Sequence, residues 1–466
     1  MTVGLARVTV SAPERRVDVA LPEQVPLAEL LPELLRHAGV GLADDGERHG
    51  GWLLRRADGS ALATGQALLA QGVRDGEVLH LVPARAQWPE LEYDDVVEAI
   101  ADGARRRGDA WSPPATRAAA FAGAGVLLAV GLLALAAGGP GDAAGWLVAT
   151  VVAALLVLAG TVLSRAQGDG PAGATVGGYA LPYAAVAGAL AVSSGDPVGP
   201  VGPLRWIGAA ELLAGSVALL LVSVLGLLGV AARLRIFVAG VVVGAAGGLA
   251  ALGGLLLGPA GAAATLLCVL AFAIGAIPLL AIRLGKVPLP PITLPTGNPE
   301  DPDRARDLPD RGRVYAAVAR TEEMLTGMLI GHAVLAVAAA VVLGATGGTA
   351  GRLLVAVTSA VLLLRARLFV AVRHRVPPLL AGLAGYAVLG ALLAGGAGPA
   401  GRLALVAAGV LIALLVVAGG TSYARRPVSP YVGRAADLAD TALVVSVVPI
   451  TCAVLGLYER ARGLLG

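Results

Sequence analysis

Long apolar runs, separated by short polar or glycine- and proline-rich breaks, fill the chain from about residue 118 almost to its end. A helix rises about 1.5 Å per residue, so about 20 apolar residues cross a hydrocarbon core about 30 Å thick. The pattern therefore predicts about eleven transmembrane helices. We place them at residues 118–137, 143–163, 172–192, 207–230, 236–257, 260–282, 325–345, 353–369, 377–393, 403–420 and 441–457. The eighth is the weakest, because Arg352 and Arg365 bound a short apolar stretch.

The N-terminal part of the chain has a different pattern, with charged residues, prolines and no long apolar run. Apolar and polar residues alternate as in half-buried strands, and one segment has the leucine spacing of an amphipathic helix. The predicted order is strand 5–10, strand 16–21, helix 27–37, strand 52–56 and strand 78–82. Leu62, Leu68 and Leu69 are expected to supply a short strand and core residues. This order predicts an α+β domain of the ubiquitin-like (β-grasp) type.

These two patterns divide the chain into a ubiquitin-like domain at residues 1–85, a charged linker at 86–117 and a transmembrane domain at 118–466. The transmembrane domain contains a long polar loop at 283–320. Its last part, from Val314 to Glu323, is predicted to be helical, either lying at the membrane surface or extending the seventh span. The overall fold class is thus an α-helical polytopic membrane protein with an N-terminal α+β domain.

Composition agrees with this division, since 57% of the residues are hydrophobic and only 14% are charged. Soluble proteins carry about 25% charged residues. Arginines are concentrated in alternate connections between the spans, which by the positive-inside rule places the N-terminus in the cytosol and the C-terminus outside. Arg460 and Arg462 depart from this bias. The start of the chain lacks a basic region followed by an apolar core, so we expect the first domain to stay cytosolic.

A basic cluster precedes the first span and is formed by Arg105, Arg106, Arg107 and Arg117. Such a cluster could contact nucleic acid, but beside a membrane it is more typical of an anchor to anionic lipid headgroups. We therefore expect membrane lipids, and no nucleic acid, as its partner.

Small residues mark one span in particular, because Gly240, Gly244 and Gly248 are spaced four apart. A ridge of this kind lets two helices approach closely. It predicts either a contact between two copies of the chain or packing within one bundle. His332 is the titratable side chain placed well inside a span. A proton relay is one interpretation, and a polar side chain packed between helices is the favoured one.

Motifs for chemistry are absent from the sequence. Lys286 follows Gly285, yet Val287 occupies the position where a phosphate-binding loop needs Ser or Thr. No His, Cys or Asp cluster has metal-ligand spacing. Cys268 and Cys452 lie in apolar runs and are typical of buried small side chains rather than a disulfide. We expect no catalytic, cofactor-binding or metal-binding residues.

A ubiquitin-like domain joined by a basic linker to about eleven spans resembles the EccD family, the polytopic membrane component of the actinobacterial type VII (ESX) secretion system. Local stretches at 165–169 and 183–188 share the resemblance. It implies a subunit that is not an enzyme and that pairs with a second copy around a lipid-facing vestibule. It also implies partners: an EccC-like FtsK/SpoIIIE ATPase and the EccB- and EccE-like membrane subunits. The exported substrates would be of the WXG100 type.

Two other functions remain open at this stage. A secondary transporter with a regulatory N-terminal domain is supported by the number of spans. A membrane enzyme would need polar groups near an interface, and the acidic candidates lie in no recognisable arrangement. They are Glu211, Glu322, Glu323, Asp437 and Asp440. A non-enzymatic secretion subunit explains the docking domain, the polar-poor spans and the missing motor together, so it is the leading hypothesis.

Overall fold

The computed structural model describes residues 4–12, 15–39, 42, 51–84, 111–141, 144–286, 311–425 and 429–465. The chain divides into two compact units, Met1–Ser112 and Pro113–Gly466. Most of the expected linker lies outside the described residues, and so do Arg105, Arg106 and Arg107 of the predicted membrane anchor. The middle of the expected loop, 287–310, lies outside them too.

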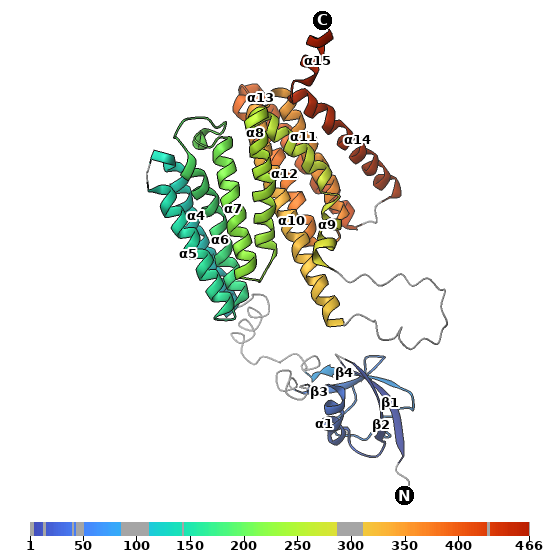
Figure 1. The fold of residues 1–466 in the computed structure, drawn as a ribbon. Coiled ribbons are helices and arrows are strands. Elements are labelled where there is room, and N and C mark those ends of the chain that lie inside the picture. The colour runs from blue at the N-terminus through green and yellow to red at the C-terminus, as the bar shows by residue number, and fades with distance from the viewer. Residues whose placement is uncertain are drawn as a thin grey trace, which may run out of the picture. The chain divides into compact units, whose positions relative to one another are not determined.

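The first unit contains a four-stranded sheet and one helix (Figure 1). Its elements are β1 (Leu5–Ser11), β2 (Arg16–Pro22), α1 (Leu27–Ala38), β3 (Trp52–Arg56) and β4 (Val78–Pro83). The strand order is β2-β1-β4-β3, in which β1 and β4 are parallel and the other neighbours are antiparallel. Two parallel strands need a crossover connection between them. The connection from β1 to β4 includes α1, which lies between β2 and β3. The order of strands and helix predicted from the alternation is confirmed.

The core of this unit lies between α1 and one face of the sheet. Leu27 of α1, Leu54 of β3 and Leu79 of β4 are fully buried there. The Trp52 indole N–H donates a 2.7 Å hydrogen bond to the Leu42 carbonyl, which satisfies its polar atom within the core. One detail of the prediction is wrong. Near these leucines the chain forms only isolated bridges, at Ala61 and Ala67, rather than a strand. Leu69 is 57% exposed because it points away from the core that Leu62 and Leu68 enter.

The second unit is helical, and ten helices in the described part of the chain are long and apolar enough to cross a membrane. They are α4 (Pro113–Gly138), α5 (Gly145–Arg165), α6 (Gly170–Val192), α7 (Ala209–Gly229), α8 (Arg235–Ala273), α10 (Arg311–Thr346), α11 (Gly348–Arg365), α12 (Val372–Gly396), α13 (Pro399–Arg425) and α14 (Pro430–Val454). Shorter helices are η2 (Gly139–Gly141), η3 (Gly202–Leu204), α9 (Ile277–Gly285), η5 (Ala366–Leu368) and α15 (Leu457–Leu465).

One of these helices, α8, accounts for the difference between ten and the expected number of about eleven. It has 39 residues, and its backbone leaves the helical conformation at Gly258, where φ is 70° and ψ is 174°. Glycine adopts this conformation without strain, and Pro259 can open the next segment. A straight helix of this length would measure about 58 Å, roughly twice a hydrocarbon core. The residues before Gly258 and those after Pro259, continued by α9, therefore match the two expected spans 236–257 and 260–282.

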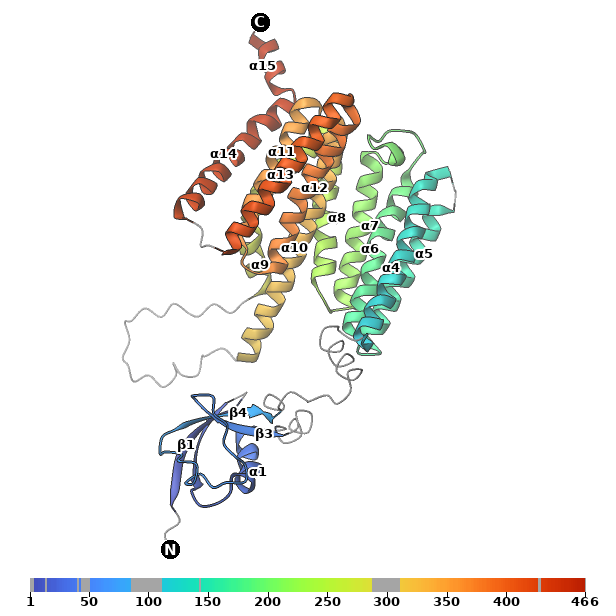
Figure 2. The same ribbon diagram turned by 180° about the vertical axis from the view of Figure 1, so that it is seen from behind.

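Two further helices differ from the predicted bounds. The eighth expected span, 353–369, corresponds to α11, which begins earlier, at Gly348, includes the exposed Arg352 and ends at Arg365, followed by η5. α10 begins at Arg311 and has 36 residues, so the segment predicted as a surface helix or an extension is the extension. At about 54 Å, α10 exceeds a hydrocarbon core by about 24 Å. Its first turns project beyond the neighbouring helices (Figure 2).

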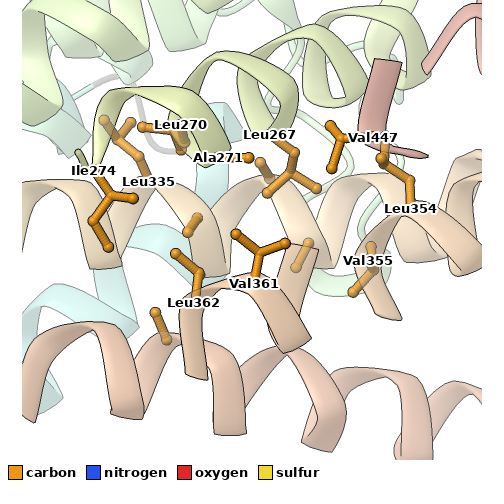
Figure 3. Packing of buried hydrophobic residues seen from close by; sticks show 14 of the residues in the cluster. Leu267, Leu270, Ala271, Ile274, Leu335, Leu354, Val355, Val361, Leu362 and Val447 are labelled. Carbon is orange, nitrogen blue, oxygen red and sulfur yellow. The ribbon is translucent and has the colours of Figure 1, made fainter. Parts of the chain in front are cut away.

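Buried side chains of α8, α10, α11 and α14 form the largest apolar cluster of this unit. Figure 3 shows Leu267 and Leu270 of α8, with Ile274 just after its end, facing Val361 and Leu362 of α11. The contact between α5 and α6 includes closely packed alanine and glycine residues. This cluster packs α8, α10, α11 and α14 against one another, and the charged residues described below lie near the ends of these helices.

Candidate functional site

Charged side chains of the second unit gather at one end of its helices, which we call the arginine end. It is the end at which α4 begins and α5 finishes (Figure 1). It contains the ion pairs Arg117–Asp169, Arg235–Glu323, Arg373–Glu322, Arg365–Asp440 and Arg367–Asp437. Each ion pair joins two segments that are distant in the sequence, so the ion pairs connect several helices at this end. The arrangement keeps ionisable groups where water and headgroups can solvate them.

Arg117, a predicted membrane-surface anchor, joins α4 to the start of α6. It donates two hydrogen bonds of 2.5 Å to the Asp169 carboxylate, and its guanidinium lies 5.6 Å from the centre of the Phe121 ring. Asp169 also accepts a 3.1 Å hydrogen bond from the Ala172 amide and so caps α6. The hydrogen bond from Arg117, followed by the one from Ala172, holds the pKa of Asp169 below its usual range. Arg117 therefore fastens two helices, while 49% of its side chain remains exposed.

Arg165 and Ser164 join the end of α5 to the end of α7. The Arg165 guanidinium donates to the carbonyls of Gly229 (2.8 Å) and Leu228 (3.0 Å). The Ser164 hydroxyl donates to the Val230 carbonyl at 2.5 Å. The last carbonyls of a helix lack intrahelical partners and carry partial negative charge, so a cation here stabilises the end of α7.

Two adjacent carboxylates, Glu322 and Glu323, connect α10 to two other helices. Glu323 pairs with Arg235 at 3.7 Å and accepts a 3.2 Å hydrogen bond from its backbone amide, which holds the start of α8. Glu322 pairs with Arg373 at 2.5 Å, which holds the start of α12. Adjacent helical residues point in different directions, and this divergence lets one turn of α10 serve both neighbours.

Arg365 and Arg367 bind the peripheral helix α14. Arg365 reaches Asp440 at 3.2 Å and also donates a 2.8 Å hydrogen bond to the Ala271 carbonyl of α8, and this pair is largely buried. Arg367 pairs with the more exposed Asp437. The sequence showed both carboxylates before the last span but gave no sign of these partners, which lie 75 and 70 residues away along the chain.

The glycine ridge of Gly240, Gly244 and Gly248 lies against α7 of the same chain. A Cβ added at Gly244 would lie 2.8 Å from the Ser216 carbonyl oxygen and 2.9 Å from the Leu220 amide nitrogen. Gly240 contacts Ser223, and all three glycines are buried. The ridge thus forms a close backbone contact between two neighbouring helices of one bundle.

His332 is buried between α10 and α8, with 2% of its surface exposed. Its Nε2 lies 2.9 Å from the Leu270 carbonyl, and because a carbonyl only accepts, Nε2 carries the proton. Its Nδ1 has no hydrogen-bond partner among the described residues. Within those residues, no group of three His, Cys, Asp or Glu side chains lies together as a metal site. Cys268 and Cys452 are free thiols.

An apolar groove of about 820 Å³ runs along α5, α6 and α7. Small side chains such as Ala153, Ala187 and Gly188 form part of its lining, with Trp146 near one end and Gly229 near the other. Its lining suits acyl chains or a closely packed helix. The groove was not anticipated from the sequence, in which these residues are ordinary span residues.

These features define a multi-span membrane protein that carries a separate β-grasp domain. The model of the EccD-like transmembrane domain matches residues 116–464, and the model of the WXG100 protein secretion system (Wss) protein YukD matches residues 5–81. Since the first match covers more than half of the chain, the protein belongs to the EccD family of type VII (ESX) secretion systems.

Curated relatives and solved structures agree with this family. The ESX-4 secretion system protein eccD4, from two strains of Mycobacterium tuberculosis, is 29% identical over an alignment 482 positions long, which covers 99% of this chain and 98% of the relative. Protomer 1 of the ESX-3 core complex has a chain with 23% identity and a TM-score of 0.55, covering 98% of this chain and 99% of that one. A chain of the MycP5-free ESX-5 inner membrane complex has 22% identity and a TM-score of 0.54, covering 91% of this chain and 100% of its own. The structures support the shared fold.

Proposed function

We propose that this protein is a non-enzymatic scaffold subunit of an ESX secretion complex, which pairs with a second copy in the membrane and docks partner subunits through its N-terminal domain. The observation that carries the proposal is the combination of a separately folded β-grasp unit with a bundle whose described ion pairs all lie at one end. A helix end that is cross-linked by ion pairs, and a separately folded domain joined to the first helix through the chain, suit a scaffold that receives partners from one side.

The arginine end is the cytosolic end in this proposal. Arginines favour the cytosolic side of a membrane. Arg165, Arg235 and Arg365 all lie at this end, with the first unit connected to α4 there. The N-terminus is then cytosolic and the C-terminus extracytoplasmic. A tag at Gly466 that is reachable from outside intact cells supports this layout, and a tag that is protected in sealed cells contradicts it.

The proposed partners are an EccC-like FtsK/SpoIIIE ATPase, EccB- and EccE-like membrane subunits, membrane lipids and a second copy of the chain. We assign the glycine ridge on α8 to packing within the chain, because α7 already occupies it. The contact with a second copy would then use helices that the chain leaves uncovered. α4 and α13 have no buried residues among those whose burial the structure describes, and they are the main candidates.

Deletion of residues 1–85 tests the docking role. We expect the truncated chain to insert into the membrane normally but to lose co-purification with the membrane-bound ATPase in mild detergent. The full-length chain carried through the same extraction is the control. If the truncated chain still co-purifies in normal amount, the N-terminal domain is not the docking element. If the full-length chain remains solitary, the scaffold proposal itself is wrong.

The transporter alternative makes a separate prediction. Uptake of a substrate by the purified chain in liposomes, lost on replacing His332, would favour it. The hydrogen bond from His332 to the Leu270 carbonyl instead fits a side chain that packs α10 against α8. No described contact brings a second ionisable side chain to this histidine.

A further inference from the structure

The sixth expected span is interrupted where α8 ends and α9 begins. α8 ends at Ala273, and a turn at 274–276 separates it from α9, which starts at Ile277. Pro278 has no backbone N–H, so it cannot bond the Ile274 carbonyl as a residue of a continuous helix would. The last carbonyls of α8 therefore need partners from other parts of the chain, because the interior of a membrane supplies no water.

Side chains of two other helices supply such partners. His332 of α10 has its Nε2 2.9 Å from the Leu270 carbonyl, which keeps a longer, 3.3 Å bond to the Ile274 amide. Arg365 of α11 donates a 2.8 Å hydrogen bond to the Ala271 carbonyl. Two consecutive carbonyls of α8 are thus bonded by two different helices. The break explains why a histidine and a largely buried arginine lie inside the bundle, since each bonds a backbone group near the end of α8.

The same guanidinium group of Arg365 also binds α14. Its Nε donates to both carboxylate oxygens of Asp440, at 3.2 and 3.3 Å, while its Nη1 reaches Ala271. Asp440 lies where the packing of α14 changes. The buried residues of α14 begin at Val444, whereas Tyr431 near its start is 83% exposed. The carboxylate that orients Arg365 therefore belongs to a helix whose first turns pack little against the bundle.

α9 contacts the bundle along one face. Ile277 and Ala281 are buried, whereas Leu279 is 67% exposed. The end of α9 lies against α10, where a Cβ added at Gly285 would be 2.9 Å from the Cβ of Thr321. α9 is thus a short segment that α10 supports from one side and that joins α8 through a turn, so the turn can serve as a hinge.

We propose that the Arg365 guanidinium is a latch that couples the position of α14 to the hinge before α9. With Asp440 in place, the guanidinium holds the Ala271 carbonyl and fixes the angle of the hinge. When the first turns of α14 move away from α11, the carboxylate leaves, Arg365 loses the group that orients it, and α9 becomes able to pivot. The coupling passes through one side chain with two bonded partners. It goes beyond the scaffold function and does not depend on which subunits dock.

Hydrogen exchange of the full-length chain in lipid nanodiscs tests the latch. Asp440→Ala removes the carboxylate, and we expect the amides of 274–285 to exchange at least about fivefold faster, because the hinge loses a charge-assisted hydrogen bond. Asp437→Ala is the matched control, since Arg367 donates to Asp437 and to the Gly433 carbonyl, both on α14. It should change the exchange of 274–285 less than about twofold.

A purely structural role for the pair gives a different result. Asp440→Ala would then speed exchange in α14 and leave 274–285 unchanged, and this outcome would overturn the proposal. So would equal acceleration of 274–285 by Asp440→Ala and Asp437→Ala. The amides of α6 report on general loosening of the bundle and should be unaffected in both variants. Arg365→Lys should act like Asp440→Ala, because a point charge cannot reproduce the planar fork that bonds Asp440 and Ala271 together.

A background without the hinge gives the sharpest test. Pro278→Ala restores the missing N–H, and Gly275→Ala favours a continuous helix. A Cβ at Gly275 meets only the Phe272 carbonyl oxygen, at 3.8 Å, so the added methyl group fits. In this background Asp440→Ala should change the exchange of 274–285 less than about twofold, because the backbone of a continuous helix bonds its own carbonyls. The same acceleration with and without the hinge would contradict the latch. If this background does not fold, the comparison of Asp440→Ala with Asp437→Ala still decides.

Discussion

The two units of this chain both bury large apolar side chains, but they differ in how their closest contacts are made. In the β-grasp unit the fully buried positions are large, and Leu27, Leu54, Leu68 and Leu79 have no measurable exposure. In the membrane unit the closest contacts are made by residues with almost no side chain. A Cβ added at Gly160 of α5 would lie 2.7 Å from the Gly173 carbonyl oxygen of α6.

The solvent explains this difference. In water, burying a large apolar side chain is favourable because it removes apolar surface from water. In a bilayer the surroundings are already apolar, so helices gain little by burying a leucine and more by close packing of backbones. Close contacts between glycines are therefore an added source of stability in the membrane unit, beside its core of large side chains.

The largest effect should follow from removing volume in the β-grasp core. We expect Leu54→Ala to destabilise this unit by about 3 kcal/mol, through lost burial and the cavity left behind. Hydrogen exchange of the β3 and β4 amides in the full-length protein measures it. Leu69→Ala is the matched control, and because Leu69 is 57% exposed it should change the exchange little. Similar effects of both substitutions would mean that Leu54 is not part of the core.

Adding volume should be the damaging change in the membrane unit. Gly160→Ala places a methyl group against the backbone of α6, which cannot rotate away, so we expect a loss of about 2 kcal/mol. Gly253→Ala is the control, since a Cβ at Gly253 meets nothing within 4 Å. It should be neutral or slightly stabilising. Thermal denaturation in detergent compares the two. A greater loss for Gly253→Ala would contradict the role of glycine as a contact residue.

Elements with a strong local pattern were predictable from the sequence. The leucine spacing of α1 and the alternation in β1 to β4 fixed the first unit, because one face of each element must be apolar. The break at Gly258–Pro259 marked two spans where the helix has 39 residues. Leu69 was misassigned because a leucine beside Leu68 has the same composition whether it enters the core or points outward.

Contacts between distant segments were not predictable. Glu322 and Glu323 were visible as carboxylates before a span, yet nothing local indicates that they reach Arg373 and Arg235. The partner of the glycine ridge was equally undetermined, since a small-residue surface fits a neighbour in the chain as well as a second copy. Pairing depends on which helices become neighbours, and that is decided by the whole bundle.

Ion pairs at the arginine end extend the comparison to burial of charge. Arg365–Asp440 is largely buried and tied also to Ala271, whereas the Asp437 side chain that pairs with Arg367 is 74% exposed. We expect Asp440→Asn to cost about 1.5 kcal/mol, because it removes charge-assisted hydrogen bonds. Asp437→Asn should cost less than about 0.5 kcal/mol, as exposed pairs do. Exchange of the α14 amides measures both. Equal losses of stability in the two variants would show that the difference in burial does not make the Arg365–Asp440 pair stronger than the Arg367–Asp437 pair.

The smallest effect should come from the exposed pair at the start of α6. Arg117 holds the pKa of Asp169 below its usual range, so the pair contributes stability above the pKa of the unfolded carboxyl, which is about 4. That contribution is lost as the pH falls from about 4 through the lower pKa of the folded state. Asp169→Asn removes the titration. Its melting temperature should lie below that of the wild type by less than about 2 °C at neutral pH, and the gap should close in acid. A gap that widens as the pH falls would mean that Arg117 does not stabilise the ionised carboxylate.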